Sequence, residues 1–306
     1  LCWQSSRRLV AKGCKQKNTN MDITIDHQIS DEDMASLCRE LKIRYGADFT
    51  SYEPKSFKRR LVRAFTKFDL QTFSDLWQKL ARQPDFIYQF VDEITVGLTS
   101  MFRDPELWTS LRALFQREFA NQREIKIWHA GCSTGEEVVT LAILLEECGM
   151  LNRCKRLATD LNKKSVAFSE AARYSIANWP QYQKNYSAYR PSGLLSDCFE
   201  LHDDEYVLKD KYRINCSFSR HNLISEGFRP EQYDIIFCRN VMIYFDNELK
   251  KKLVSKFHKV LKPNGFLIAG FLDNMLPIMN SSEFKMYDAA AKIFTTKEES
   301  TEVVTK

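Results

Sequence analysis

The segment Gly131–Glu137 has the composition of a loop that could bind a positively charged ligand. It reads Gly-Cys-Ser-Thr-Gly-Glu-Glu and joins an expected strand to an expected helix. Gly131 and Gly135 would let the backbone approach a ligand closely. The spacing matches neither the dinucleotide motif G-x-G-x-x-G nor a phosphate loop, which needs a following Lys and Ser or Thr. Glu136 and Glu137 at the helix start would repel a pyrophosphate and attract a cation.

Polar residues also follow two other expected strands. Asp160 ends one of them, at a point where nucleotide-binding folds place an acid that accepts ribose hydroxyls. As an alternative, Asp160 caps the next helix. Arg239 and Asn240 close the apolar run Tyr233–Cys238, and Tyr244 follows shortly after; a capped loop with a core tyrosine is the alternative there. S-adenosylmethionine, which carries an ammonium, a sulfonium and a ribose, suits such a site.

The pattern of apolar residues predicts the elements that position these groups. Up to Phe119 the apolar residues recur mainly at helical spacing, and from Ile125 onward short apolar runs alternate with helical patterns. Strands that alternate with helices form parallel sheets through right-handed crossovers. The sequence therefore predicts a doubly wound, Rossmann-like α/β sheet preceded by an all-α domain. Helices are expected at about 30–41, 54–65, 71–81, 85–94, 105–119 and 247–261, and strands at 125–130, 155–158, 233–238 and 266–271.

One region does not follow the alternation of strands and helices. Residues 199–218 read as short apolar runs separated by polar turns, which predicts a small antiparallel β insert. Its strands are expected at 199–201, 206–208 and 213–218. The segment 262–265 reads Lys-Pro-Asn-Gly and predicts a turn, and residues 286–296 could add an antiparallel hairpin at the sheet edge.

The change of pattern places a domain boundary near Asn121. The helical N-terminal domain is expected at 30–120 and the α/β domain at 121–306. Residues 1–29 are expected to form a disordered tail, with Met21 as a candidate natural start.

Composition excludes several classes of protein. The 306 residues are 44% hydrophobic and 28% charged, with a net charge of +5 that gives no reason to expect nucleic acid. The longest apolar run, Val138–Leu145, is too short to span a membrane. Nine cysteines and five histidines are dispersed without a CxxC pair, so no metal site is expected. Unpaired cysteines suit the reducing cytoplasm, and Cys132 and Cys238 are expected to be buried rather than nucleophilic.

Together these segments resemble the chemotaxis receptor methyltransferases of the CheR type. The resemblance extends over about 30–296 and is most specific in the run Ile236–Asp246, which reads Ile-Phe-Cys-Arg-Asn-Val-Met-Ile-Tyr-Phe-Asp. The other matching segments are Ser133–Glu137, Ala158–Asp160, Asn222–Leu223, Lys262–Gly265 and Ala269–Gly270.

The resemblance implies an activity and its partners. The protein would transfer the methyl group of S-adenosylmethionine to receptor glutamates, forming glutamate methyl esters in sensory adaptation and leaving S-adenosylhomocysteine. It would act in the cytoplasm as a monomer that engages the cytoplasmic helices of chemotaxis receptors, without membrane insertion. The implied catalytic residues are Arg103 and Tyr244, and the implied cofactor-binding residues are Thr99, Arg103, Glu137, Asp160, Asn222, Leu223, Arg239 and Asn240.

The implied chemistry needs little from the protein beyond placement of the reactants. A glutamate is already ionised at neutral pH, so methyl transfer to it requires no general base. Arg103 would hold the acceptor carboxylate, because its planar fork binds a carboxylate in fixed geometry. A solvated surface arginine is the alternative. Because Arg103 falls within the expected helical domain, the active site would lie between two domains.

A basic helix offers a docking surface. Lys55, Arg59 and Arg63 share one helix face at four-residue spacing. Such a run is usually a solvated face, but the resemblance implies that it binds the acidic methylation helices of a receptor.

The chain departs from the family pattern at several positions. Gly97 stands where the family commonly has Asn, Val138 where Pro often follows the two glutamates, and Gly270–Asp273 where the family has Gly-His-Ser-Glu. The turn His202–Glu205 of the insert, which would take the place of the receptor-tether module, has no glycine. Two alternatives stay open: a methyltransferase with another substrate, and a module that senses the cofactor without catalysis.

Overall fold

The computed structural model of the chain describes residues 29–45, 49–50, 52–83, 86–94 and 99–297. The tail predicted at residues 1–29 lies outside them except for Ile29, and Gly97 lies outside them too. The chain divides into two compact units. The first comprises Leu1–Val96 with Tyr244–Asp246, and the second comprises Gly97–Ile243 with Asn247–Lys306.

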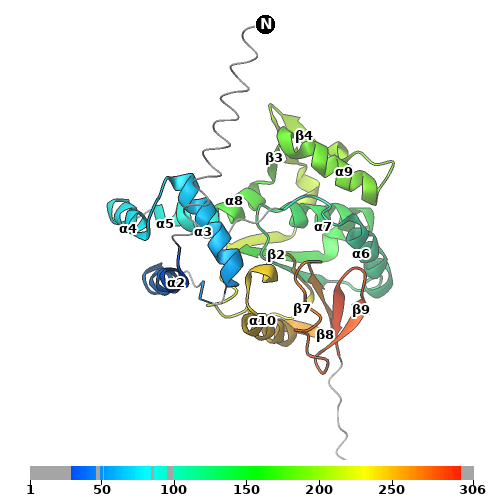
Figure 1. Cartoon of the computed structure of the whole chain (residues 1–306). Coiled ribbons are helices and arrows are strands. Elements are labelled where there is room, and N and C mark those ends of the chain that lie inside the picture. The colour runs from blue at the N-terminus through cyan, green and yellow to red at the C-terminus, as the bar shows by residue number, and fades with distance from the viewer. Residues whose placement is uncertain (1–28, 46–48, 51, 84–85, 95–98, 298–306) are drawn as a thin grey trace, which may run out of the picture. The chain divides into compact units, whose positions relative to one another are not determined.

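Helix caps define the helices of the first unit. Ser30 caps the first of them, because its Oγ accepts a hydrogen bond from Asp33 N at 3.1 Å. Glu53 caps the next helix, which has Pro54 in its first turn, and Thr72 forms a capping box with Asp75. The helices are α2 (Asp31–Tyr45), α3 (Pro54–Phe68), α4 (Phe73–Arg82) and α5 (Phe86–Ile94) (Figure 1).

The apolar stripes of these helices form the core of the first unit. Leu37 and Leu41 of α2, Leu61 and Phe65 of α3, and Phe90 of α5 are all at most 1% exposed. The segment 244–246 belongs to the same unit, where Phe245 forms an isolated antiparallel bridge with Tyr52 and their ring centroids lie 5.3 Å apart.

The second unit is built on a seven-stranded sheet in the order β6-β2-β1-β7-β8-β10-β9. The five strands from β6 to β8 run parallel, and β10 and β9 close the sheet as the antiparallel edge hairpin that the sequence predicted. The strands are β1 (Ile125–Ala130), β2 (Cys154–Asp160), β6 (Cys216–Arg220), β7 (Tyr233–Cys238), β8 (Leu261–Ala269), β9 (Phe284–Asp288) and β10 (Ile293–Thr296).

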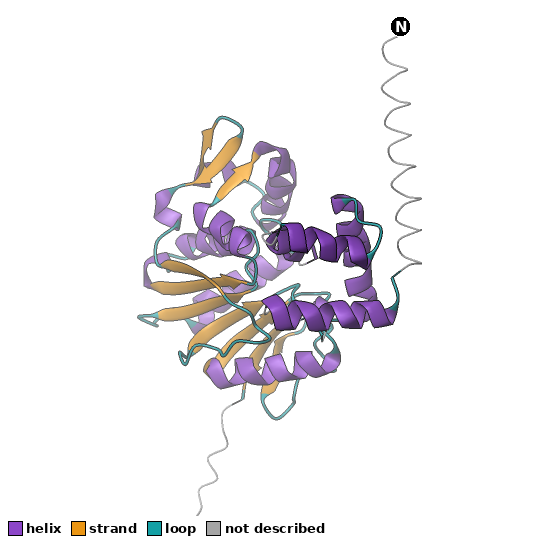
Figure 2. Cartoon of the chain, turned by 90° about the vertical axis from the view of Figure 1, so that its left-hand side faces the viewer, coloured by secondary structure: helices purple, strands orange, loops and turns teal. Residues whose placement is uncertain are grey.

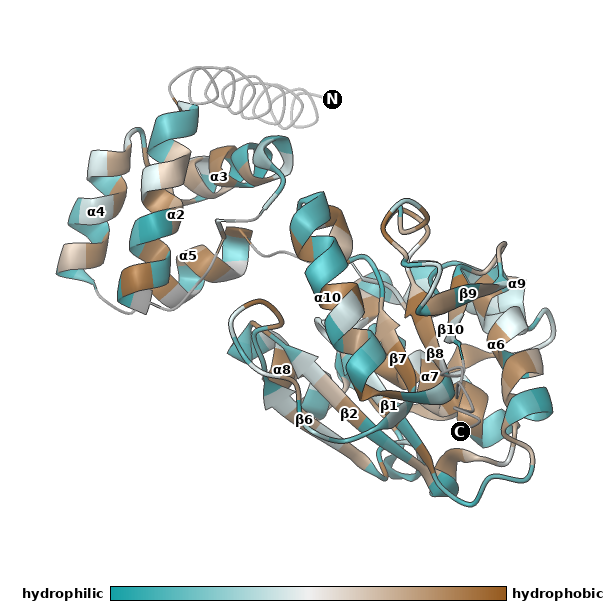
Figure 3. Ribbon diagram, turned by 90° about the horizontal axis from the view of Figure 1, so that it is seen from below, coloured by the Kyte–Doolittle hydropathy of each residue, from teal (hydrophilic) through white to brown (hydrophobic). Residues whose placement is uncertain are grey.

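The central strands are apolar because both faces of the sheet are covered. Every residue of β7 is buried, and β7 and β8 carry the hydrophobic colour in Figure 3. Helices cover the sheet (Figure 2). The helices of the second unit are α6 (Pro105–Glu118), α7 (Glu136–Glu147), α8 (Lys163–Ala171), α9 (Trp179–Tyr189) and α10 (Asn247–Val260).

The division between the units differs from the predicted boundary near Asn121. Helix α6 belongs to the second unit, because Trp108, Leu111 and Phe115 are buried in the same core as Ile127 of β1. The helical pattern of apolar residues continues to Phe119, but the division between the two units falls earlier, between Val96 and Gly97. Consequently Arg103 belongs to the second unit, which contradicts its predicted place in the helical domain.

The small antiparallel insert exists, but its strands differ from the prediction. Its order is β3-β5-β4, with β3 (Arg173–Ser175), β4 (Phe199–His202) and β5 (Glu205–Leu208). The run predicted as its third strand is β6, which pairs parallel with β2 in the main sheet. The predicted turn at 262–265 lies inside β8, where Asn264 has a φ of 59° and the register with β7 shifts. Among the described residues, no helix is long and apolar enough to cross a membrane.

Candidate active site

Several of the predicted site residues follow the carboxyl ends of parallel strands, with Asp160 at the end of β2 and Arg239 and Asn240 directly after β7. The strand order reverses between β1 and β7, so their ends flank a switch point, where ligands bind in open α/β sheets. Backbone hydrogen bonds join the neighbouring ends. The N–H groups of Gly131 and Cys132 donate to Thr159 O at 2.8 and 2.9 Å, and His221 N donates to Asp160 O at 2.9 Å. The loops after β1, β2 and β6 therefore meet at one place.

The two glycines of the first loop are required by packing within the protein. Gly131 has a φ of 93°, and a Cβ there would lie 2.4 Å from Val241 Cγ2. Gly135 has a φ of 91°, and its Cβ would lie 2.3 Å from Ser169 Oγ. Both positions need a left-handed backbone and have no room for a side chain. The predicted role of these glycines, close approach to a ligand, stays a prediction.

Asp160 ends β2, and Asn222 follows shortly after the end of β6. Asp160 Oδ2 accepts a hydrogen bond from Ser133 N at 2.8 Å, and Oδ1 accepts one from Asn162 N at 3.0 Å. A carboxylate oxygen can accept more than one hydrogen bond, as the predicted contact with a ribose hydroxyl would require. Asn222 is 2% exposed, and among the described residues its Nδ2 has no hydrogen-bond partner. A buried donor without a partner fits a ligand acceptor, and Leu223, 8% exposed, adds an apolar neighbour.

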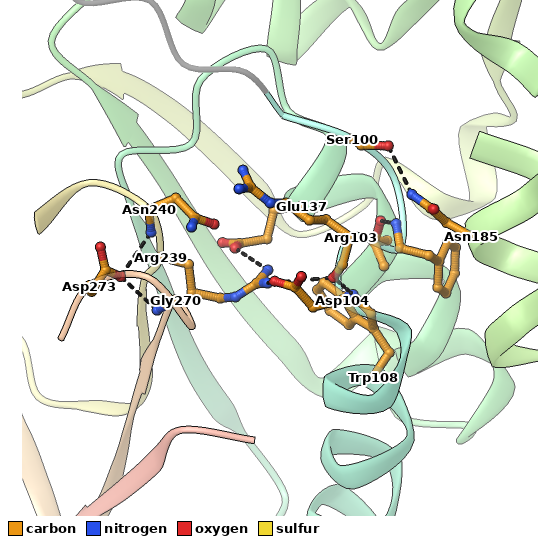
Figure 4. A network of polar contacts seen from close by, with 12 residues as sticks. Ser100, Arg103, Asp104, Trp108, Glu137, Asn185, Arg239, Asn240, Gly270 and Asp273 are labelled. Atoms are coloured by element: carbon orange, nitrogen blue, oxygen red, sulfur yellow. Dashed lines mark hydrogen bonds and ion pairs between the residues drawn. The ribbon is translucent and has the colours of Figure 1, made fainter. Parts of the chain in front are cut away.

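A buried ion-pair network lies at the ends of β1 and β7 (Figure 4). The side chain of Arg239 is 3% exposed, and its guanidinium donates to Glu137 Oε2 at 3.0 Å and to Asp104 Oδ2 at 2.7 Å. His129 Nδ1 lies 2.9 Å from Glu137 Oε1. The Arg239 guanidinium also lies 5.7 Å from the centre of the Trp108 ring. Arg239 thus joins the loop at Asp104 to the start of α7.

The network fixes the charge of Glu137. Burial acts to raise the pKa of its carboxyl, but the hydrogen bond with His129 and the charge of Arg239 outweigh burial and leave the pKa lowered. Both oxygens are engaged and 16% of the side chain is exposed, so a ligand could reach only the open edge of Glu137. That Glu137 and Arg239 bind cofactor stays a prediction.

Arg103 lies in a tight turn before α6. Phe102 and Asp104, which flank it, have φ values of 49° and 58°, in the left-handed region that non-glycine residues rarely adopt. The carbonyl oxygen of Arg103 accepts a hydrogen bond from Trp108 Nε1 at 2.8 Å. The turn also places Thr99 just ahead of it, partly exposed like Arg103.

A buried carboxylate holds the turn that carries Asn240. Asp273 is fully buried and accepts hydrogen bonds from the backbone N–H groups of Asn240 at 2.9 Å and Gly270 at 2.6 Å (Figure 4). It also accepts one from Ile243 N at 3.1 Å. Burial raises the pKa of its carboxyl, although these N–H groups oppose the shift. Tyr244 follows in a short 3₁₀ helix, and its side chain lies outside the described residues.

The sequence analysis did not single out three residues of this region, namely Asp104, His129 and Asp273. Only Asp273 carried a signal, because it ends the segment that departs from the family's Gly-His-Ser-Glu. Burial, together with nearby acids, raises the pKa of the Cys132 and Cys238 thiols well above the ordinary value, which agrees with their expected structural role. Within the described ranges, no cluster of three or more His, Cys, Asp or Glu could hold a metal.

The basic face of α3 is exposed as the sequence predicted. Lys55, Arg59 and Arg63 are exposed, whereas Arg60 is buried and donates from Nη1 to Ile94 O at 2.8 Å. The face that the three exposed residues share is therefore available to a partner. That they bind a receptor stays a prediction.

Comparison with known proteins decides the family. The description "CheR methyltransferase, SAM binding domain" matches residues 97–293, and "CheR methyltransferase, all-alpha domain" matches residues 32–95. The chain belongs to the CheR methyltransferase family. It is an S-adenosylmethionine-dependent methyltransferase, and the predicted fold class and cofactor are confirmed. The two matched ranges meet at Val96, where the structure also divides.

Several relatives of this CheR-family chain are similar over most of their length. Putative methyltransferase Cher3 from Pseudomonas putida is 32% identical, and the match covers 91% of this chain and 98% of the relative. A chemotaxis protein methyltransferase from Listeria monocytogenes is 28% identical over 80% of this chain and 91% of its own. Among solved structures, a TehB-like SAM-dependent methyltransferase from Corynebacterium glutamicum is 12% identical with a TM-score of 0.36, covering 74% of this chain and 96% of that one.

Proposed function

We propose that the protein methylates glutamate side chains of chemotaxis receptors, producing methyl esters that adjust receptor output. The names of relatives support this substrate, since proteins from Listeria monocytogenes and Vibrio cholerae with 28% and 29% identity are called chemotaxis protein methyltransferases. The observation that carries the proposal is the fixed turn of Arg103, which presents a guanidinium within the cofactor-binding unit. A guanidinium suits an acceptor carboxylate.

The residues of the site would divide the work by position. Asp160 would accept the ribose hydroxyls, and Asn222 with Leu223 would contact the adenine side. Thr99, Arg103 and the open edge of Glu137 would lie toward the methionine end, and Asn240 would face the cofactor from the end of β7. Arg239 would contribute through its ion pairs with Glu137 and Asp104.

Arg103 would orient the reaction. When bound, S-adenosylmethionine supplies a sulfonium methyl group, to which the glutamate oxygen forms a bond as the sulfur–carbon bond breaks. The acceptor carboxylate is ionised at neutral pH, so no residue has to remove a proton. Arg103 would hold that carboxylate in line with the methyl group, and orientation of this kind can account for much of a rate enhancement. Tyr244 would lie near the transferred methyl.

The exposed face of α3 would dock the receptor. Lys55, Arg59 and Arg63 present three positive charges on one helix face, which complements a helix rich in glutamates. Docking through exposed charges weakens as salt is added, because the Debye length falls to about 10 Å at 0.1 M.

A transfer assay with radiolabelled S-adenosylmethionine and receptor-containing membranes tests the proposal. We expect label to enter the receptor and to leave it as methanol under mild alkali, because methyl esters hydrolyse there and methylated amines do not. Label that resists alkali would mean a nitrogen acceptor and would overturn the substrate assignment. Cofactor binding without any transfer would instead support a sensing module.

A further inference from the structure

The turn that carries Arg103 adopts a backbone conformation that its own sequence disfavours. Phe102 and Asp104 both have a left-handed backbone conformation. The Phe102 side chain is fully buried, so packing inside the protein surrounds this residue. A non-glycine residue stays in this region only where its surroundings over-determine the conformation, which happens most often at functional sites. The contacts that hold the turn are therefore candidates for a role in the reaction.

Helix α9 supplies the first of these contacts. Asn185 Nδ2 donates to Ser100 Oγ at 3.0 Å and to Met101 O at 2.8 Å (Figure 4). Gln181 Nε2 donates to Asn185 Oδ1 at 2.8 Å. The glutamine therefore sets the orientation of the Asn185 amide, which leaves its nitrogen directed at the turn.

Aromatic rings and a hydroxyl hold the next residue. The Phe102 ring packs against the rings of Tyr186 and Tyr189 of α9, with centroid distances of 4.8 and 5.0 Å. Phe102 N donates to Thr140 Oγ1 of α7 at 3.0 Å. Helix α9 thus contacts the turn at two neighbouring residues. The Asn185 amide bonds Met101, two residues before Arg103, and the tyrosine rings pack on Phe102, the residue directly before Arg103.

The same helix also reaches the cofactor loop. Tyr182 of α9 donates from its hydroxyl to Glu136 Oε1 at 2.9 Å, and Glu136 is 5% exposed. Tyr174 of β3 donates to Thr134 O at 3.2 Å. The insert and its helix are thereby bonded to both the loop after β1 and the turn of Arg103.

We infer that Asn185 is a positioning residue for methyl transfer, which keeps Arg103 in place by anchoring its turn to α9. The inference rests on the proposed role of Arg103. It gives the α9 helix a part in the active site in addition to any role of the insert in binding partners. Asn185 does not itself touch the reacting atoms.

Single-turnover transfer and product binding test the inference on the full chain. We expect Asn185→Ala to lower the transfer rate at least about tenfold, because small misplacements of an orienting group are costly, while S-adenosylhomocysteine affinity changes less than about threefold. Asn185→Asp should be slower still, since a carboxylate cannot donate to Met101 O and repels it. Gln183→Ala is the matched control. Gln183 is an amide of the same helix that bonds Gly193 O and Leu195 N instead of the turn, so its loss should leave the rate unchanged.

Hydrogen exchange gives a readout that does not depend on methyl transfer. Asn185→Ala should raise amide exchange in residues 101–104, whereas Gln183→Ala should not. If the wild-type protein transfers no methyl group, the proposed function is wrong, and exchange still decides whether Asn185 anchors the turn. Unchanged exchange, or an unchanged rate in an active protein, would overturn the inference. Asn185→Asp, which keeps the size of the side chain but cannot donate to Met101 O, provides the second variant for the exchange measurement should Asn185→Ala fail to fold.

Discussion

Arg103 is the residue on which the proposed chemistry depends most. We expect Arg103→Ala to lower single-turnover transfer by about 10²-fold or more, because orientation of the acceptor is lost. Arg103→Lys should recover little, since an ammonium cannot reproduce the planar fork. Affinity for S-adenosylhomocysteine should fall less than the rate in both variants. Near-normal transfer by Arg103→Ala would show that another group holds the acceptor.

Asp160 lies where the ribose is expected. Asp160→Ala should weaken S-adenosylhomocysteine binding by about 1.5–3 kcal/mol, or about tenfold or more in affinity. Because Ser133 N also bonds this carboxylate, Asp160→Asn is the matched variant, as it keeps one acceptor for the loop. Calorimetric titration measures both. An unchanged dissociation constant for Asp160→Ala would reduce Asp160 to a loop-stabilising role.

Glu137 makes stability depend on pH in a defined direction. Its folded-state pKa is lower than the ordinary 4.5, so its contribution to stability is complete above that value and is lost as the pH falls through the folded pKa. Replacing one partner of a buried ion pair costs about 3 kcal/mol or more, which is the loss expected for Glu137→Gln at neutral pH. The difference from the wild type should shrink below pH 4.5. Urea unfolding across this range measures it, and a constant difference would contradict the assignment.

The spacing of residues along the chain predicts some of the site residues but not others. Asp160 and Asn240 follow recognisable strands, so their place at the sheet edge could be predicted. Asp104 could not, because its partner Arg239 is brought to it only by the folded sheet. Ion pairs between residues 135 apart in sequence leave no local pattern.

At the scale of elements, α3 is the surface that the proposed function needs. Reversing its charge by Arg59→Glu with Arg63→Glu should slow receptor methylation and reduce its sensitivity to salt, because steering through exposed charges is lost. Product binding should be unchanged. The matched control reverses two exposed charges on other helices of the same unit, Arg39→Glu with Arg82→Glu.

The control keeps net charge equal between the two double variants. If both slow methylation alike, overall charge rather than the α3 face is responsible. A normal rate and a normal salt response in the α3 variant would mean that the face is only solvated.

The sequence predicted that the run at 213–218 forms a strand, but it did not predict which strand it pairs with. The strand β6 was expected in the insert because it follows two short strands of similar character, yet it pairs with β2. Its residues are half-buried or exposed, as those of an edge strand of either sheet would be. The choice depends on the open edge of β2, which no local feature of residues 216–220 encodes.

For the whole molecule, the eight proposed cofactor-binding residues fall within the second unit. S-adenosylhomocysteine at 100 times its dissociation constant should stabilise that unit by about 2.7 kcal/mol. Hydrogen exchange should therefore slow in the sheet and its loops, with little change in α2–α5. Equal protection of α2–α5 would show that the two units unfold together or that the first also binds the product.

The two-unit organisation was predictable, but the boundary was not. The spacing of apolar residues shows that α6 is a helix. It does not show whether the apolar face of α6 packs in the core of the first unit or of the second. Trp108 and Phe115 pack with the sheet, so the first helix of the second unit reads from sequence as the last helix of the first.

The anchoring of the β7 turn by Asp273 has a consequence for synthesis on the ribosome. The chain emerges from its N-terminus, so Arg239 and Asn240 appear before the carboxylate that accepts the N–H groups of Asn240 and Ile243. Crosslinking a cofactor analogue to stalled nascent chains of increasing length should show binding only once Asp273 has left the exit tunnel. A nascent chain that stops between Ile243 and Asp273 would contain every proposed cofactor contact, and we expect it to bind no ligand.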